Sequence, residues 1–120
     1  MIFRDELPIY IQIMNLIKIQ IVNGEFKSED KLLSVRDLAK ELKVNPNTVQ
    51  RAYQELELEG LVETKRGMGT FIKEDDKILE KLKNDLAEKI VLEFLDKIKN
   101  LGFTNEEIVN IIKKEIGKEN

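Results

Sequence analysis

Helical spacing of apolar residues predicts a helix near the start of the chain, over residues 8–23. The isoleucines of this segment also alternate as they would in a β-strand, so periodicity alone leaves both structures open. The length of the segment favours the helix, because Pro8 suits a first helical position and Gly24 follows directly after the expected end.

Two further helices joined by a tight turn are predicted over residues 34–43 and 46–59. Ser34 is expected to cap the first helix, with Asp37 three residues on as a weaker form of the capping box. Asn45 is expected to cap the second helix, whose first position is a proline. This arrangement predicts a helix-turn-helix.

A β-hairpin is predicted directly after these helices, with strands at residues 61–64 and 70–73. Gly67 and Gly69 in its turn permit positive φ and let the backbone approach a partner closely. A hairpin in this position is typical of a wing, so residues 1–75 are predicted to form a winged helix-turn-helix domain that binds duplex DNA.

From residue 76 onward the pattern changes to a long charged helix with an apolar stripe. Gly102 ends this helix, and Thr104 with Glu107 forms a capping box for a last helix. The predicted fold class is therefore mainly α with a small β wing. An N-terminal winged helix-turn-helix is followed by a two-helix tail over residues 76–120.

The 120-residue chain contains no cysteine and no histidine. Disulfides, thiolate nucleophiles and the usual zinc sites are thereby excluded, and the commonest general base is missing. We therefore expect no enzyme activity, no metal site and no cofactor. The N-terminus does not resemble a signal peptide and no segment is apolar for long enough to cross a bilayer, so we expect a cytoplasmic protein with no membrane partner.

Basic residues are unevenly placed, although the net charge is −3. Residues 43–54 contain two basic residues and no acidic one, and residues 64–73 contain three basic residues and no acidic one. These two stretches correspond to the predicted second helix of the helix-turn-helix and to the wing. Both are therefore candidates for contact with DNA.

The exposed face of the predicted helix 46–59 carries side chains suited to base edges. The major groove of B-DNA, roughly 12 Å wide, admits one helix, and within it Asn and Gln suit adenine while Arg suits guanine. A polar face is also typical of an ordinary solvated helix, so the face alone does not decide. The candidate base-reading residues are Asn47, Gln50, Arg51 and Gln54.

The predicted wing has a basic tip formed by Lys65, Arg66, Gly67, Met68 and Gly69. Cationic side chains and exposed backbone both suit the minor groove or the phosphates. The two glycines on their own would fit any hairpin turn. Their position after two capped helices is what favours a DNA-binding wing.

Arg36 lies at the start of the predicted helix 34–43. It could reach a base or a phosphate, or it could pair with the nearby carboxylates Asp37 and Glu41. The helix and wing that follow favour contact with DNA.

Four segments together resemble the DNA-binding domain of GntR-family bacterial transcription regulators, at residues 33–39, 44–49, 59–62 and 66–71. The variant at residues 45–53, followed by a short helical tail, looks most like the YtrA-type subgroup. With the residues that the resemblance implies, the expected DNA-contacting set is Arg36, Asn45, Asn47, Thr48, Gln50, Arg51, Gln54, Lys65, Arg66, Gly67 and Gly69.

The sequence departs from the family pattern at three positions. Leu33 stands where the family usually has proline, which should loosen the approach to the helix that follows. Pro46 and Gln50 occupy places where other subgroups have arginine. The base preference of those relatives therefore does not transfer to this chain.

The apolar stripe of the tail is too broad for a single solvent-exposed helix. The two tail helices can fold back on one another, but a pair of helices makes only a thin core. A tail that packs entirely on its own domain is one solution. We expect instead a homodimer that presents two reading helices to a roughly palindromic site. The expected dimerisation residues are Leu79, Leu82, Leu86, Ile90, Phe94, Ile98, Ile108 and Ile112.

The predicted function is a sequence-specific transcription regulator, more readily a repressor because nothing resembles a surface that activates polymerase. Glu55, Glu57 and Glu59 lend some support to an alternative, a winged-helix module that binds protein or RNA. A small-molecule effector, if one exists, would bind at the dimer junction, since two helices leave little room for a pocket.

Overall fold

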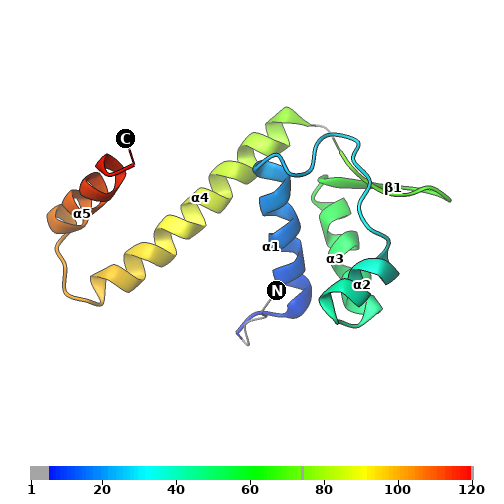
Figure 1. The fold of residues 1–120 in the computed structure, drawn as a ribbon, viewed down its shortest axis with the longest axis horizontal. Coiled ribbons are helices and arrows are strands. Elements are labelled where there is room, and N and C mark those ends of the chain that lie inside the picture. The colour runs from blue at the N-terminus through cyan, green and yellow to red at the C-terminus, as the bar shows by residue number, and fades with distance from the viewer. Residues whose placement is uncertain (1–5, 74, 120) are drawn as a thin grey trace. The chain divides into compact units, whose positions relative to one another are not determined.

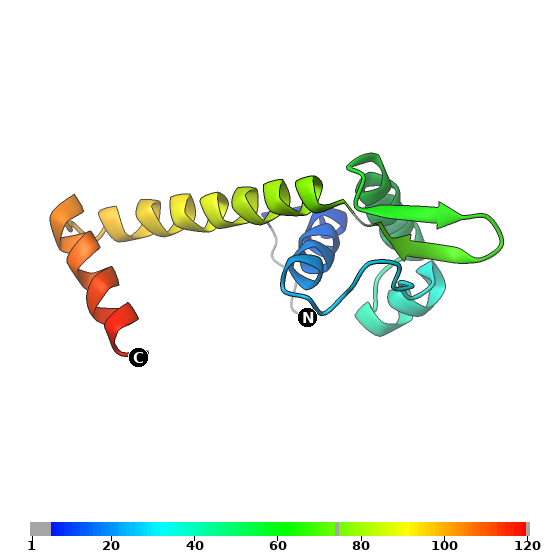
Figure 2. The same cartoon turned by 90° about the horizontal axis from the view of Figure 1, so that it is seen from above.

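The computed structural model describes residues 6–73 and 75–119, shown in two views in Figures 1 and 2. Contacts within the chain group it into two compact units, Met1–Lys83 and Asn84–Asn120. The expected class, mainly α with a small β wing, is confirmed. In chain order the elements are α1 (Ile9–Val22), α2 (Val35–Leu42), α3 (Pro46–Leu58), β1 (Val62–Lys65), β2 (Gly69–Ile72), α4 (Asp76–Lys99) and α5 (Asn105–Gly117).

The first segment forms a helix, α1, as its length predicted. Ile13, Ile17 and Ile21 repeat every fourth residue and so share one buried face, which packs against α3 (Figure 1). Gln12 is also buried, and its amide nitrogen donates to the Leu7 carbonyl at 2.9 Å. The polar group therefore enters the core with a partner.

The helix-turn-helix is held by the caps that the sequence predicted. The Ser34 hydroxyl accepts from the Asp37 N–H at 3.1 Å at the start of α2. The Asn45 side chain accepts from the Asn47 N–H at 2.8 Å at the start of α3. Between the helices, Lys43 takes a left-handed conformation with φ of 58°, which closes the tight turn.

Tyr53 of α3 connects the core to the segment before α2. Its hydroxyl donates to the Leu33 carbonyl at 2.7 Å, and burial raises the pKa of this hydroxyl to about 12. The bond ties Leu33, which precedes α2, to α3.

The wing is an antiparallel hairpin that projects from the helices of its unit (Figure 2). Val62 lies opposite Ile72, and Lys65 lies opposite Gly69. Each strand is displaced by one residue from the predicted range, because the Met68 N–H donates to the Lys65 carbonyl at 2.9 Å and closes a tighter turn.

The connector before α2 pairs with the outer edge of β2. The Leu32 N–H donates to the Thr70 carbonyl at 2.8 Å, and the Ile72 N–H donates to the Asp30 carbonyl at 2.8 Å. Lys31 lies opposite Phe71 in this pairing. The edge of β2 is thus covered, and the wing is firmly joined to the helical core.

α4 contributes to both units. Its first residues belong to the first unit, where Ile78, Leu79 and Leu82 pack against the core. No residue of α4 is buried, even though the helix is 24 residues long. None of the helices described, over residues 6–73 and 75–119, is long and apolar enough to span a membrane.

α5 begins with the predicted capping box. The Glu107 N–H donates to the Thr104 hydroxyl at 3.2 Å, and the Thr104 N–H donates to the Glu107 carboxylate at 2.9 Å. Ile108 is the one buried residue among those described in the second unit. This unit therefore has almost no core of its own.

Candidate nucleic-acid interface

α3 has one buried side and one exposed side. The residues that face the core are Val49, Ala52, Tyr53 and Leu56. The predicted base-reading residues are all exposed, namely Asn47, Gln50, Arg51 and Gln54. Helical spacing places Asn47, Arg51 and Gln54 at the centre of the exposed side and Gln50 nearer its edge.

Asn45 and Thr48 lie at the start of the same helix. The Asn45 side-chain oxygen is occupied by the cap to Asn47, which leaves its amide nitrogen to donate to a partner. Thr48 is half-buried. Asn45 therefore has a structural role in addition to any contact with DNA.

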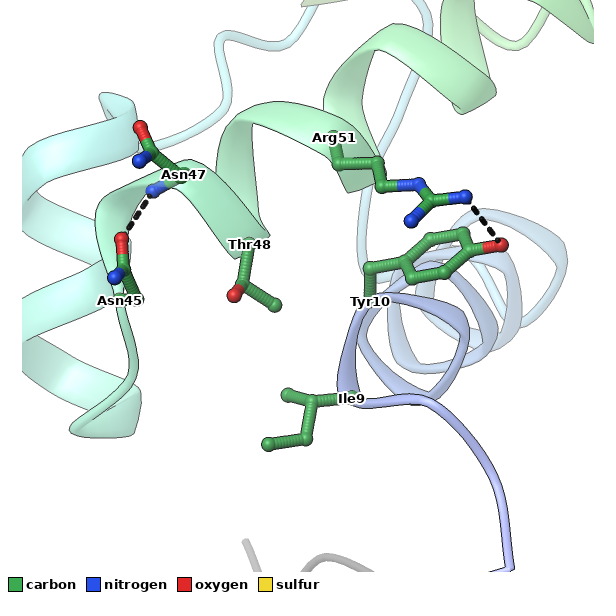
Figure 3. A pocket seen from close by; sticks show the side chains of 6 residues that line it. All are labelled: Ile9, Tyr10, Asn45, Asn47, Thr48 and Arg51. Atoms are coloured by element: carbon green, nitrogen blue, oxygen red, sulfur yellow. Dashed lines mark hydrogen bonds between the residues drawn. The ribbon is translucent and has the colours of Figure 1, made fainter.

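A pocket of about 360 Å³ opens between the N-terminal ends of α1 and α3, and Figure 3 shows its lining. Thr48 and Ile9 face one another across the hollow, with Arg51 and Tyr10 on one side and the Asn45–Asn47 cap on the other. The lining residues are Ile9, Tyr10, Asn45, Asn47, Thr48 and Arg51. Four predicted DNA-contacting residues thus converge on one concavity.

Arg51 is held by Tyr10 of α1 within this pocket. The guanidinium carbon lies 3.9 Å from the centroid of the Tyr10 ring, and a guanidinium nitrogen donates to the Tyr10 hydroxyl at 3.2 Å (Figure 3). In the sequence, Tyr10 shows only as one of the regularly spaced apolar and aromatic residues that predict a helix over residues 8–23. Its contact with Arg51 spans 41 residues, and no local signal in the sequence indicates it.

The wing carries its predicted cations, and the connector before α2 adds another that the sequence reasoning missed. The Lys65 ammonium lies 4.8 Å from the centroid of the Phe71 ring, and Lys31 lies directly opposite Phe71. Opposed residues of neighbouring strands point to the same face of a sheet, so both cations lie on the same face of the wing. Arg66 is exposed at the turn.

The two glycines of the wing are required for different structural reasons. Gly67 has φ of 77° in open space, so only its backbone conformation favours glycine. Gly69 has φ of 121°, and a Cβ atom there would lie 2.7 Å from Cε of Lys31. Gly69 therefore makes room for the Lys31 side chain at the wing tip.

Arg36 is exposed near the start of α2. Within residues 6–73 and 75–119, neither a hydrogen bond nor an ion pair holds its guanidinium, so the alternative pairing with Asp37 or Glu41 is absent from the described chain. Its charge is available to an incoming phosphate or base.

Two of the three acidic residues that favoured another function have structural partners. A Glu57 carboxylate oxygen accepts from the Thr64 N–H of β1 at 2.6 Å, which joins α3 to the wing. Glu59 forms an ion pair with Lys18 of α1 at 2.9 Å. Their presence on α3 is explained by these contacts and does not argue for an acidic binding surface.

A capped helix-turn-helix, an exposed polar reading face and a basic wing together define a winged-helix DNA-binding protein. The sequence profile of the family described as "Bacterial regulatory proteins, gntR family" matches residues 9–72. The chain belongs to the GntR family of bacterial transcription regulators. The resemblance inferred from the sequence is therefore confirmed.

Similarity extends over nearly the whole chain. An uncharacterised helix-turn-helix regulator from Bacillus subtilis, YhcF, is 46% identical over 111 residues, which cover 92% of each chain. The repressor YtrA from the same organism is 51% identical over 74 residues, 62% of this chain and 57% of YtrA. A solved GntR-family regulator from Listeria monocytogenes matches with a TM-score of 0.82 and 45% identity, over 93% of this chain and 98% of that one. The YtrA-like assignment is consistent with these relatives.

Proposed function

We propose that this chain is a homodimeric repressor that binds a roughly palindromic operator through α3 and the wing. The observation that carries the proposal is the side of α3 on which Asn47, Arg51 and Gln54 are exposed. Asn47 and Arg51 also line a pocket that has no carboxylate in its lining. Such side chains can exchange hydrogen bonds with base edges, each good bidentate pair being worth about 1–3 kcal/mol of discrimination. The repressor assignment draws on the relative YtrA, which is named as one.

The remaining residues divide by charge and position. Lys65, Arg66 and Lys31 are assigned to phosphates, because a cation on the wing attracts the backbone regardless of sequence. Gly67 and Gly69 let the wing backbone lie close to DNA. Arg36 is assigned to a phosphate or a base edge beside α2.

The second copy is proposed to cover the tail. Ile90 is 63% exposed and Phe94 37% exposed on α4, and Ile112 is 38% exposed on α5. Exposed apolar side chains of this kind, in a unit whose described residues include one that is buried, are stabilised when a symmetric partner removes them from water. Two copies would set two reading helices about one DNA turn apart.

The other members of the expected dimerisation set have different roles in one copy. Leu79 and Leu82 pack against the core of the first unit, and Ile108 is buried in the second. We propose that these three residues support the tail, while Leu86, Ile98 and the exposed residues form the interface. The functional boundary is kept near residue 75, between the wing and α4.

Selection of bound sequences from a random DNA pool tests the proposal. We expect an enriched inverted repeat whose half-sites reflect the two-fold symmetry of the protein. A mass measurement in solution at micromolar concentration should give twice the mass of one chain. Absence of any enriched sequence would refute specific recognition, and a monomer would refute the dimer.

Four variants assign the contacts. Arg36→Ala and Arg51→Ala should weaken the selected site more than random DNA, whereas Lys65→Ala and Arg66→Ala should weaken both alike and reduce the salt slope by about 1 each. Lys97→Ala, in the tail, is the matched control for loss of one positive charge. An equal effect of the control would show that net charge alone governs binding.

A further inference from the structure

Tyr10 lies on α1, outside the proposed reading helix α3, yet it contacts the side chain of Arg51, one of the candidate base-reading residues. Its ring lies 3.9 Å from the guanidinium carbon of Arg51 and its hydroxyl accepts a hydrogen bond at 3.2 Å. The ring and the hydroxyl act on the same group, so both the position and the rotation of the guanidinium are restrained. An exposed arginine normally retains much of its rotamer freedom, and here two contacts remove it.

The support beneath Tyr10 is rigid. Tyr10 is half-buried and packs against the core, and it stands one helical turn before Ile13 and Met14, which are buried. α1 itself packs along α3, the helix that carries Arg51. The ring is therefore fixed with respect to the backbone of the reading helix.

Arg51 keeps enough free donors to bind DNA while it remains on Tyr10. A guanidinium has five N–H donors, and the Tyr10 hydroxyl uses one of them. Stacking occupies one face of the guanidinium plane, and hydrogen bonds are made at its edge. A bidentate pair with a guanine edge is thus compatible with the contact to Tyr10.

We propose that Tyr10 is a positioning residue for Arg51, which it holds at the mouth of the pocket so that the guanidinium meets the base edge already ordered. The inference rests on the proposed function, because it assumes that α3 reads the operator. Tyr10 then contributes to discrimination between sequences and leaves general affinity for DNA unchanged. It also makes the start of α1 part of the recognition surface.

Another role for the same contact would have the opposite effect. If Tyr10 held Arg51 away from DNA in the free protein, removal of the ring would raise affinity for the operator. If Tyr10 served only to pack α1, its removal would weaken binding to every duplex through loss of fold. The positioning role predicts a loss confined to the operator and dependent on Arg51.

The test uses the full chain, the duplex enriched from the random pool and a scrambled duplex of the same composition. Tyr10→Leu, which removes ring and hydroxyl, should lower affinity for the enriched duplex about fivefold to tenfold, because the rotamer freedom of Arg51 must then be lost on binding. Affinity for the scrambled duplex and the salt slope should stay unchanged. Tyr10→Phe, which keeps the ring, should recover most of the loss.

A double-mutant cycle connects the effect to Arg51. In the Arg51→Ala background, Tyr10→Leu should cause no further loss on the enriched duplex, because the group it positions is gone. Ile17→Val is the matched control, since it removes one methylene from the buried face of α1 without touching Arg51. An Arg51 side-chain NMR signal that is shifted by the Tyr10 ring, and that moves in Tyr10→Leu, gives a readout that does not need DNA.

The outcomes are separable. Equal losses on both duplexes, a gain in affinity, or an undiminished Tyr10→Leu effect without Arg51 would each overturn the positioning role. If Arg51→Ala weakens the enriched duplex and Tyr10→Leu does not, this inference fails while the proposed function stands. If Arg51→Ala has no effect on any duplex, the assignment of α3 as the reader fails first. Should Tyr10→Leu not fold, Tyr10→Phe and the NMR signal of Arg51 carry the test.

Discussion

The hydrogen bond between Glu57 and the wing offers a direct test of how the wing is held. Glu57 is the next-to-last residue of α3, and its carboxylate accepts from the Thr64 N–H at 2.6 Å. Thr64 lies on β1, and this N–H points away from β2 toward the helix. Glu57→Ala removes the acceptor and leaves the Thr64 N–H, on the outer edge of β1, without its partner on α3.

The expected loss of stability in Glu57→Ala follows from the charge of the Glu57 carboxylate and from its exposure to water. A hydrogen bond to a charged group contributes about 1.5–3 kcal/mol, but water can replace the acceptor at this exposed site, so we expect a loss of about 1 kcal/mol. For a unit of this size, such a loss lowers Tm by about 4–8 °C. The wing should loosen first, because the bond is its only side-chain link to α3 among the hydrogen bonds of the described residues.

Thermal unfolding and DNA binding should be measured together on Glu57→Ala and on Glu63→Ala. Glu63 is exposed on β1, next to Thr64, so each variant removes one carboxylate near the proposed DNA surface. Loss of negative charge should favour DNA binding equally in the two, and the difference between them isolates the hydrogen bond. If both variants unfold at the wild-type temperature, the bond does not stabilise the wing and the reasoning is refuted.

Three other predictions follow from single contacts. Phe94→Glu should give a monomer by mass at micromolar concentration, with Lys97→Glu as a control that leaves the dimer intact. Tyr53→Phe should cost about 1 kcal/mol, seen as a lower midpoint in urea. Because the folded-state pKa of Tyr53 is raised from 10.0 to about 12, stability should be complete below pH 10 and fall as the pH rises toward 12, and Tyr53→Phe should remove this decline. Gly69→Ala should weaken DNA binding more than Gly67→Ala does, in a gel-shift titration, because it also displaces Lys31; equal losses would contradict this.

For local features, the sequence predicted both the structure and the residues that form it. The caps at Ser34, Asn45 and Thr104 depend on a side chain and an N–H two or three residues apart, so short-range patterns contain all the necessary information. The exposed face of α3 followed in the same way, from helical periodicity. The strand ends were displaced by one residue because the turn between them closes on a backbone hydrogen bond that no side chain reports.

Features that join distant segments were not predicted. Tyr10 and Arg51 are 41 residues apart, and so are Lys18 and Glu59, because α1 must first pack on α3 before either pair can meet. Lys31 joined the wing only through the pairing of the connector with β2. Helical periodicity also could not distinguish Leu79, which packs on the first unit, from Ile90, which remains exposed.

The sequence by itself determined the class of the protein, since helix periods, caps, a glycine-bearing basic turn and the absence of histidine and cysteine all depend on residue type and short spacing. The tertiary structure decided which of these residues act together. It placed Tyr10 beneath Arg51, turned Glu57 and Glu59 from candidate binding groups into supports, and brought Lys31 to the wing. Side-chain contacts of a few ångströms depend on how helices pack, and packing is a property of the whole core that no single stretch of sequence encodes.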